Sequence, residues 1–300
     1  MERRKMSISC IIPFFNRSEK VLRCLNSING IDIPDIEFLL IDDGSNESES
    51  NIIRSEIKRD QRIKYKKIVK QGVSAARNIG LQSASKKWII FIDSDDQIDA
   101  GEFNSIVRTI NDETDVYILG FTKKMSPDNN IEEVNFQNMS CSTQQLLEKE
   151  LKQNFNRYIF NPIWNKIYLN TVTKKIRFDE SFSYGEDLLF NLNIFKVTHS
   201  IKFLSSKYYQ YNIEPNSSIS SCFYPEITKE TIEINEKIIE LFEYYGLQKN
   251  CRDNIIEMLH NTEKRVVQHK KKYILDPKQL TNELNKDKKA FKAIYDKIAP

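Results

Sequence analysis

The chain has 300 residues, of which 40% are hydrophobic, so it can bury a sizeable core and is too apolar for a disordered protein. Its formal net charge of +3 argues against a nucleic-acid partner. The five cysteines are odd in number and show no CxxC spacing, so we expect neither a disulfide framework nor a structural zinc site. This cysteine usage fits a reducing compartment.

Residues 1–5 are basic, but the apolar run after them is short, contains Pro13 and lacks a small-residue cleavage site. We therefore interpret the run as a strand and not as a signal peptide. No apolar stretch approaches the ~20 residues that a membrane helix needs. We expect a cytoplasmic protein that at most lies peripherally at the inner face of the plasma membrane.

Strand-like and helix-like segments alternate over the first hundred residues. The apolar runs predict strands at residues 7–13, 37–41, 63–69 and 88–92. The helical spacing of apolar residues predicts helices at residues 18–28, 47–60 and 74–83. This alternation predicts an α/β fold with a Rossmann-like, mostly parallel sheet that is flanked by helices. Ligands bind such sheets beyond the carboxyl ends of the strands, where this sequence places polar residues.

The pattern is less regular after residue 101. The next expected elements are a helix at 103–110, a strand at 116–121, a loop at 126–142 and helical structure from 143 to about 164. They are followed by a loop at 176–187, a helix at 188–196 and one or two strands at 200–211. Beyond Pro225 the apolar residues return to helical spacing, which predicts a C-terminal helical extension over 226–300.

The strongest chemical signal is the acidic segment Asp93-Ser94-Asp95-Asp96, directly after the strand expected at 88–92. Three carboxylates within four residues repel one another and need a counter-charge. Mn²⁺ or Mg²⁺ would supply it, since both prefer oxygen ligands and often take one or two carboxylates plus substrate phosphates. The alternative is an Asp-rich turn that caps the next helix, which is common in proteins.

Three further segments carry polar groups at the expected ends of strands and helices. Asp42 and Asp43 follow the strand at 37–41, where a carboxylate can accept a hydrogen bond from a nucleobase N–H. Arg77 lies in an expected helix whose small residues allow close packing on the sheet. Glu186 and Asp187, much later in the sequence, offer a base for proton transfer. Taken singly, these segments also fit an ordinary turn, a surface arginine and a helix cap.

Together these segments resemble family 2 of the inverting glycosyltransferases, which have the GT-A fold. The matching segments come in family order and at family spacing: Ile12-Pro13-Phe14-Phe15-Asn16, Ile41-Asp42-Asp43-Gly44-Ser45, Gly72 with Ser74-Ala75-Ala76-Arg77-Asn78-Ile79-Gly80, Phe91-Ile92-Asp93-Ser94-Asp95-Asp96, Trp164-Asn165-Lys166-Ile167-Tyr168, Phe178 and Gly185-Glu186-Asp187. The resemblance extends from residue 7 to about 220. The chain departs from it at Phe15, where the family usually has Tyr, and at Gln71, where it often has Asn.

The resemblance implies a role for each site residue. The residues implied to bind the nucleotide sugar, with UDP as the expected nucleotide, are Pro13, Phe14, Asn16, Asp43, Arg77 and Asp93. Pro13 and Phe14 would line the uracil pocket, and Asp43 would hydrogen-bond the base. Asp95, together with Asp93, would hold Mn²⁺ or Mg²⁺ at the diphosphate. Asp187 would be the catalytic base, with Glu186 beside it.

The implied enzyme transfers a sugar, with inversion, to a hydroxyl of a glycan or lipid-linked glycan during synthesis of a bacterial surface glycan such as a capsule or lipopolysaccharide. Residues 1–225 would form the catalytic domain, with a nucleotide-sugar-binding half at 7–100 and an acceptor-binding half at 101–225. One alternative is a sugar nucleotidyltransferase, which usually has a glycine-rich phosphate loop that residues 12–17 lack. The other is a non-catalytic sugar-binding protein, which has little need for Asp95 and Asp187 together.

The lysine-rich segment at 226–300 lies outside the resemblance. Its basic residues can hold a protein at an anionic membrane, each contributing about 1 kcal/mol near the surface. Acidic residues such as Glu283 and Asp287 dilute this charge, so a solvated helical face is the alternative. The apolar faces of its first helices can pack on the catalytic domain or on a second copy of the chain, which would make a homo-oligomer.

Overall fold

The computed structural model describes residues 6–111, 113–152, 157–214, 225–248 and 252–298. The chain divides into two compact units. The first comprises Met1–Ser142, Pro162–Ser181 and Val197–Pro215, and the second comprises Thr143–Asn161, Phe182–Lys196 and Asn216–Pro300. Two segments from before residue 225 thus belong with the C-terminal helices, and the functional boundary expected at 225 stays a prediction.

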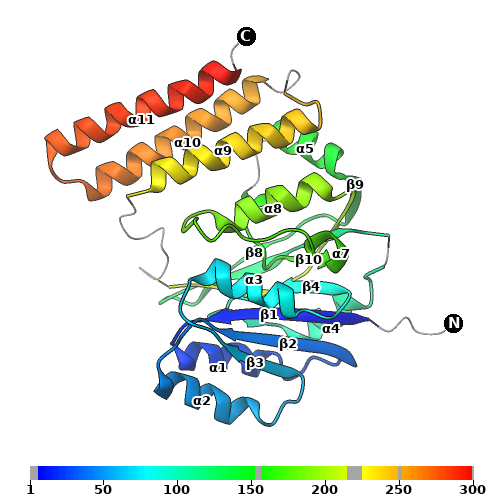
Figure 1. Ribbon diagram of the computed structural model, residues 1–300. Helices are drawn as coiled ribbons and strands as arrows, with labels where there is room; N and C mark the ends of the chain where they lie inside the picture. Colours follow the sequence, from blue (N-terminus) through cyan, green and yellow to red (C-terminus); the bar gives the residue numbers. More distant parts are fainter. Residues whose placement is uncertain (1–5, 112, 153–156, 215–224, 249–251, 299–300) are drawn as a thin grey trace. The chain divides into compact units, whose positions relative to one another are not determined.

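An eight-stranded sheet forms the centre of the first unit, in the order β3-β2-β1-β4-β10-β6-β11-β9 (Figure 1). The strands are β3 (Ile63–Lys67), β2 (Asp35–Asp42), β1 (Ser7–Phe14), β4 (Trp88–Phe91), β10 (Lys166–Leu169), β6 (Val116–Leu119), β11 (Ser200–Leu204) and β9 (Met139–Ser142). The first four run parallel to one another, as do β6 and β11. β10 and β9 run antiparallel to their neighbours. The predicted mostly parallel sheet is confirmed.

Helices cover both faces of this sheet (Figure 1). The helices of the unit are α1 (Ser18–Ser27), α2 (Glu47–Ile57), α3 (Val73–Ser83), α4 (Ala100–Val107) and α7 (Asn170–Thr173). Because both faces are covered, every residue of β1 after Ser7 is buried. α3 packs closely on β1, since a Cβ atom at Gly80 would stand 2.3 Å from Ile11 Cγ2. A glycine at position 80 therefore sets the distance between this helix and the sheet.

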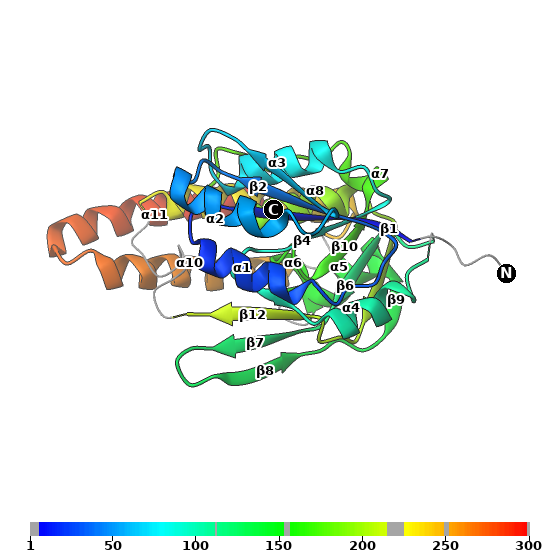
Figure 2. The same cartoon turned by 90° about the horizontal axis from the view of Figure 1, so that it is seen from below.

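A second sheet of four strands completes the first unit, in the order β5-β12-β7-β8. Its strands are β5 (Gln97–Ile98), β12 (Tyr209–Ile213), β7 (Phe121–Met125) and β8 (Asn130–Val134), and the last three lie side by side in Figure 2. β5 follows the acidic segment directly, and β12 pairs with it antiparallel. This pairing brings β12, from a distant part of the sequence, beside the acidic segment.

The predicted loop at 126–142 is wrong in part, because β8 and β9 lie within it. The first four residues of β8 are exposed and show no apolar alternation, so the sequence carries no strand signal there. Pairing with β7 and the 2.9 Å ion pair between Lys123 and Glu132 hold β8 instead. β5 and β10 are too short for their patterns to predict, and the predicted strand at 116–121 is divided into β6 and β7 at Gly120.

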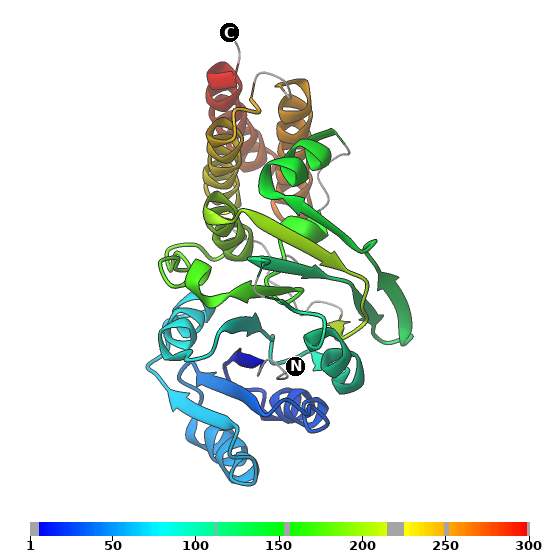
Figure 3. The same ribbon diagram turned by 90° about the vertical axis from the view of Figure 1, so that its right-hand side faces the viewer.

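The second unit is helical (Figure 3). Its helices are α5 (Thr143–Lys152), α6 (Arg157–Phe160), α8 (Glu186–Val197), α9 (Ile227–Tyr244), α10 (Arg252–Tyr273) and α11 (Pro277–Ile298). α9, α10 and α11 pack on one another, with Ile227, Val266 and Phe291 in a shared core. This bundle confirms the predicted C-terminal helical extension. Among the described residues, none of the helices combines the length and the hydropathy that a membrane-spanning helix needs.

Some sequence predictions concern residues that are not described. These are the basic start at 1–5, the helical structure expected at 153–156, and Cys222 and Cys251. Cys10 and Cys24 are buried in the first unit. The expected lack of a disulfide framework stays a prediction.

Candidate functional site

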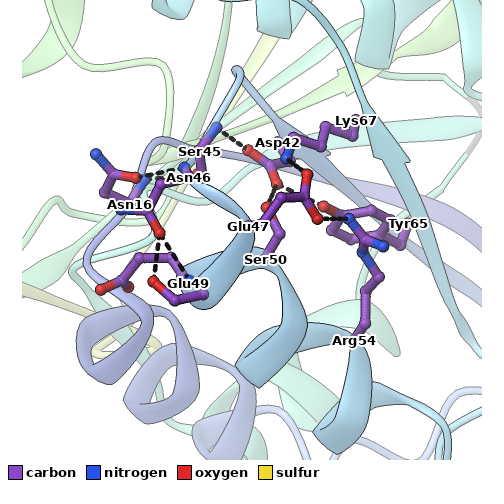
Figure 4. Close-up of polar contacts among 11 residues, drawn as sticks. Asn16, Asp42, Ser45, Asn46, Glu47, Glu49, Ser50, Arg54, Tyr65 and Lys67 are labelled. Atoms are coloured by element: carbon purple, nitrogen blue, oxygen red, sulfur yellow. Dashed lines mark hydrogen bonds and ion pairs between the residues drawn. The ribbon is translucent and has the colours of Figure 1, made fainter.

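The carboxyl ends of β1, β2 and β4 meet at one edge of the large sheet, because the three strands are parallel neighbours. After β1 the chain turns sharply, with φ values of 52° at Asn16 and 55° at Arg17, both in the left-handed region. The Asn16 backbone N–H donates to Ser45 Oγ at 2.7 Å, and the Asn46 N–H donates to Asn16 Oδ1 at 3.0 Å (Figure 4). Asn16, a predicted nucleotide-sugar residue, thus joins the loops after β1 and β2.

Asp42, the first of the acidic pair after β2, is fully buried and serves the structure. It accepts hydrogen bonds from the Ser45 backbone N–H at 2.7 Å, from Ser50 Oγ at 2.7 Å and from Tyr65 Oη at 2.5 Å (Figure 4). Burial alone would raise the pKa of Asp42, but these hydrogen bonds outweigh it and hold the pKa below its ordinary value. Asp42 is therefore an ionised anchor for the turn and the start of α2.

Asp43, the second residue of the pair, holds the loop that leads into α3. Its Oδ1 accepts from the Gln71 backbone N–H at 2.8 Å, and its Oδ2 accepts from the Gly72 N–H at 2.9 Å. Gly72 has a φ of 101°, which a side chain would make unfavourable. Each carboxylate oxygen has two lone pairs, so Asp43 keeps acceptor capacity after these bonds. Its contact with a base stays a prediction.

The aromatic residues after β1 differ in exposure. Pro13 and Phe14 are buried within the sheet, and the Phe14 ring lies 6.3 Å from that of Tyr65. The Phe15 side chain is 38% exposed, and Lys70 Nζ lies 3.7 Å from the centre of its ring. The exposed aromatic surface at this edge therefore belongs to Phe15, for which the sequence did not predict a role.

Arg77 and Asp93 connect α3 with the acidic segment after β4. The Arg77 side chain is 5% exposed, and its Nη2 lies 3.1 Å from Asp93 Oδ1. Its guanidinium also lies over the Phe178 ring, 5.3 Å from the centre. The backbone of Phe178 is in turn held by both ends of the Asn78 amide, at 2.8 and 3.0 Å. The structure thus brings together two of the predicted nucleotide-sugar residues.

Asp96 supports the acidic segment from inside the protein. Its side chain accepts from Tyr209 Oη at 2.7 Å and from the Asn212 backbone N–H at 2.7 Å, and it is almost fully buried. The Tyr209 hydroxyl also accepts the Asp93 N–H at 3.1 Å, and Asn212 Nδ2 donates to the Asp95 carbonyl at 2.8 Å. β12 therefore holds the segment through the backbone at Asp93 and Asp95 and through the side chain of Asp96.

Trp164, from the matched segment Trp164-Asn165-Lys166, supports Tyr209 in turn. The two rings are stacked, with centres 4.5 Å apart and an angle of 9° between their planes, and Tyr211 stacks on Trp164 at 5.3 Å. The Tyr209 side chain is fully buried in this stack. Sequence reasoning missed Tyr209 and Asn212, since no spacing connects them with an acidic segment more than a hundred residues earlier.

The charge of the acidic segment suits a cation. Burial and the charge of Asp93 raise the pKa of Asp95, although Lys20 and Arg17 act in the opposite direction. Burial, with the charges of Asp93 and Asp95, raises the pKa of Asp96 well above its ordinary value. Among the described residues no three acidic, histidine or cysteine side chains form a metal cluster. Asp95 and Asp93 nevertheless fit a cation that takes one or two carboxylates and completes its shell with phosphate oxygens.

Glu186 and Asp187, the predicted base pair, form the first turn of α8 in the second unit. They follow Gly185, whose φ is 79° and whose missing Cβ would stand 2.5 Å from Ile234 Cδ1 of α9. Glu230 of α9 accepts the backbone N–H groups of Ser183 at 3.2 Å and Tyr184 at 2.8 Å. The loop before Asp187 is thus tied to α9, a link that sequence reasoning missed.

The chain is similar to several bacterial glycosyltransferases. It is 25% identical to "Uncharacterized glycosyltransferase EpsJ" of Bacillus subtilis over 83% of this chain and 73% of that protein. It is 26% identical to the Campylobacter jejuni GalNAc(5)-diNAcBac-PP-undecaprenol beta-1,3-glucosyltransferase over 63% of this chain and 60% of that protein. The chain therefore spans less than two thirds of the Campylobacter enzyme.

The fold is similar to that of S. aureus TarS 1-349, crystallised in complex with UDP-GlcNAc. The TM-score is 0.66 at 20% sequence identity, and the alignment covers 98% of this chain and 90% of the TarS chain. At that identity the likeness supports the fold alone, and it agrees with the predicted GT-A architecture.

The family is decided by the sequence itself. Residues 9–180 match the model of Glycosyl transferase family 2, and they include every matched segment except Gly185-Glu186-Asp187. Membership favours the predicted transferase over a nucleotidyltransferase or a non-catalytic sugar-binding protein. Because the match covers more than half of its 300 residues, the chain belongs to glycosyl transferase family 2.

Proposed function

We propose that this glycosyltransferase transfers a sugar from a UDP-sugar donor, with inversion, to a hydroxyl of a lipid-linked glycan during synthesis of a bacterial surface glycan. The observation that carries the proposal is the meeting of Asp43, Arg77 and the acidic segment at one edge of the sheet. The undecaprenol-linked substrate of the Campylobacter relative supports a lipid-linked acceptor. The location that goes with this proposed reaction is the cytoplasm, at the inner face of the plasma membrane.

The donor nucleotide is recognised by groups already held in place. Asp43 accepts a hydrogen bond from a base N–H, and its two backbone contacts fix the carboxylate for this purpose. The exposed ring of Phe15 offers a stacking surface for the base. Asp93, oriented by Arg77, contacts the ribose or the donor sugar.

A divalent cation, Mn²⁺ or Mg²⁺, fits beside Asp95 and Asp93 and would offset the charge of the donor diphosphate. Asp95 is the stronger candidate ligand, because Arg77 already pairs with one oxygen of Asp93. Asp96 is too deeply buried and too fully bonded for this role, and it instead orients the segment. The raised pKa of Asp95 fits a carboxylate that gains from a nearby positive charge.

Asp187 accepts the proton of the acceptor hydroxyl as that oxygen bonds to the anomeric carbon. The bond from the anomeric carbon to the diphosphate oxygen breaks on the opposite face, so one displacement inverts the centre. The nucleoside diphosphate leaves with the bonding electron pair. Glu186 precedes the base in the same helical turn, and we assign it an assisting role.

Release of nucleoside diphosphate from a panel of UDP-sugars, with Mn²⁺ present, tests the activity. Asp95→Ala should weaken UDP binding in Mn²⁺ and abolish turnover. Asp187→Asn should bind UDP normally and lose roughly 10²–10⁴-fold in turnover. Asp253→Asn, at an exposed position of α10, is a matched control that should leave both unchanged. Full activity of Asp95→Ala, or of the native chain in excess chelator, would remove the cation from the proposal.

A further inference from the structure

The hairpin of α10 and α11 has an unusual distribution of charge between its inside and its outside. Lys270 is buried, and its Nζ lies 2.9 Å from Asp287 Oδ1 and 3.1 Å from Glu283 Oε2. Glu263 faces inward as well, since its Oε2 accepts from Tyr295 Oη at 3.2 Å. Three acidic residues that would dilute the basic charge of this segment are therefore used within the helix packing.

The outer surface is left strongly basic. Between residues 264 and 292, all of which are described, the exposed acidic residue is Asp276. The exposed basic residues in the same range are Lys264, Arg265, Lys271, Lys272, Lys278, Lys286, Lys288, Lys289 and Lys292. Charge dilution is therefore weaker near the turn of the folded hairpin than the sequence suggests, because the other exposed acidic residues, Asp253, Glu257 and Asp296, lie at the helix ends away from the turn.

The lysines of α11 gather on the face that points away from the bundle. At about 100° of rotation per residue, Lys278, Lys289 and Lys292 fall within an arc of roughly 60°. The opposite face carries the buried residues Phe291 and Ile294, which pack into the bundle. Over residues 278–292 this side of the helix is available to a flat anionic surface, and the exposed Asp296 lies on the same side beyond it.

The turn between the two helices adds an apolar group. Leu275 is 89% exposed, and it lies between Lys271 and Lys272 on one side and Lys278 on the other. Its neighbour Ile274 is buried, and the Ile274 N–H donates to the Lys270 carbonyl at 2.8 Å, so the turn is held in a defined shape. The hairpin thus ends in an exposed leucine that is followed by Asp276 and has Lys271, Lys272 and Lys278 nearby in the sequence.

We propose that this hairpin docks the protein on an anionic lipid bilayer, with the lysines on the headgroups and Leu275 in the interface. Basic side chains are attracted to the anionic surface, and an apolar side chain at the tip gains by leaving water. A nucleic acid would satisfy the lysines but offers no apolar layer for Leu275, so the bilayer is the better match. The inference is independent of the proposed reaction, because it rests on charge and exposure alone.

Sedimentation with vesicles tests the docking on the full chain. The wild-type protein should pellet with vesicles of phosphatidylglycerol and phosphatidylcholine at low salt, stay in solution with pure phosphatidylcholine, and be released at high salt. The charge variant carries Lys→Gln at five exposed positions that lie outside the printed ion pairs: Lys271, Lys278, Lys288, Lys289 and Lys292. At about fivefold per lysine, or roughly 1 kcal/mol each, its affinity should fall more than a hundredfold.

A matched control separates docking from net charge. It neutralises five exposed basic residues of the first unit, namely Lys58, Arg59, Lys66, Lys174 and Lys175, and should bind vesicles within a few-fold of wild type. Leu275→Ser should weaken binding about tenfold. Circular dichroism checks that each variant folds.

Three outcomes would overturn the proposal. The first is a wild-type chain that ignores anionic vesicles at low salt. The second is a control variant that loses as much affinity as the charge variant, because the attraction would then belong to net charge. The third is full binding by Leu275→Ser, because a surface of charge alone fits any polyanion and not a bilayer in particular.

Discussion

Replacing Tyr209 by Phe removes one buried hydroxyl and keeps the ring that stacks on Trp164. The hydroxyl donates to Asp96 at 2.7 Å and accepts the Asp93 N–H at 3.1 Å. A hydrogen bond to a charged group contributes roughly 1.5–3 kcal/mol and one between neutral groups roughly 0.5–1.5 kcal/mol. Where Asp96 is ionised, the free energy of unfolding should therefore fall by roughly 2–4 kcal/mol, which lowers the unfolding temperature by about 4–8 °C for a chain of this size.

The loss should also depend on pH. Burial and the charges of Asp93 and Asp95 raise the pKa of Asp96, while the Tyr209 hydrogen bond lowers it. Without that bond the pKa rises further. Between its ordinary pKa and its raised native pKa, a carboxyl group keeps its proton in the folded state but has lost it in the unfolded chain. The free energy of unfolding therefore falls as the pH rises through this range. The variant should therefore lose more stability at pH 8 than at pH 5.

Urea unfolding at the two pH values measures this loss, and titration with UDP in Mn²⁺ measures its effect on the site. If the loosened segment is competent one tenth of the time, the apparent affinity for UDP should fall about tenfold. Tyr244→Phe is the control, because the Tyr244 side chain is 66% exposed and its change should stay within about 0.5 kcal/mol. A loss in Tyr209→Phe no larger than in this control would refute the support that we assign to the hydroxyl.

Two further predictions concern carboxylates that the sequence did not single out. The hydrogen bonds of Lys64, Ser9 and Ser85 outweigh burial and lower the pKa of Glu37 to about 2, so its stabilisation is complete above the ordinary pKa near 4.5 and is lost as pH falls toward 2. Glu37→Gln should cost up to about 3 kcal/mol at pH 7 and much less at pH 3 in urea unfolding, and an equal cost at both would contradict the pKa shift. In Glu230→Gln the amide NH₂ group replaces one carboxylate oxygen, so one of the two backbone N–H groups before Asp187 loses its acceptor. Because the loop that positions Asp187 loses this contact, turnover should fall about tenfold while the affinity for UDP stays unchanged. Equal losses in turnover and affinity would contradict this local effect.

The position of the candidate site at the carboxyl edge of the sheet could be predicted, because its parts are local in sequence. Each of the strands β1, β2 and β4 is a buried apolar run that ends in polar residues, and parallel neighbours bring these ends together. The alternation with helices predicts that these strands are parallel, whereas their order comes from the structure. The sequence placed Asp43 and Asp93 at this edge in this way, and their contacts with a nucleotide sugar stay predictions.

The supports of the site could not be predicted, because they come from distant segments without a distinctive pattern. Tyr209 and Asn212 reach the acidic segment through the pairing of β12 with β5, a strand of two residues. Glu230 reaches the loop before Asp187 from a helix beyond the matched residues 9–180. Their roles depend on tertiary placement, which neither periodicity nor spacing encodes.

Asp42-Asp43 and Asp95-Asp96 each contain one carboxylate that is hydrogen-bonded to side chains of other elements, namely Asp42 and Asp96. Asp42 and Asp96 are buried and accept hydrogen bonds from side chains or backbone groups on other elements. Asp95 remains partly exposed, and no other described side chain donates a hydrogen bond to its carboxylate. Since Asp93 is paired with Arg77 and Asp96 is hydrogen-bonded, Asp95 is the carboxylate of this segment that best fits a cation.

The position of Asp95 leads to a last prediction, which concerns the stability of the folded chain. If Asp95 helps to hold Mn²⁺ with a nucleotide diphosphate, the pair should stabilise the folded chain, because they bind the native state and not the unfolded one. At a hundred times the dissociation constant the gain is about 2.7 kcal/mol, or roughly 5 °C in a thermal unfolding scan. Chelator should remove the shift, and Asp95→Asn should show little of it. If UDP with Mn²⁺ stabilised Asp95→Asn as much as wild type, Asp95 would not be a ligand of the cation. Comparing the two shifts is necessary because the substitution removes the ligand and also lessens the repulsion within the acidic segment.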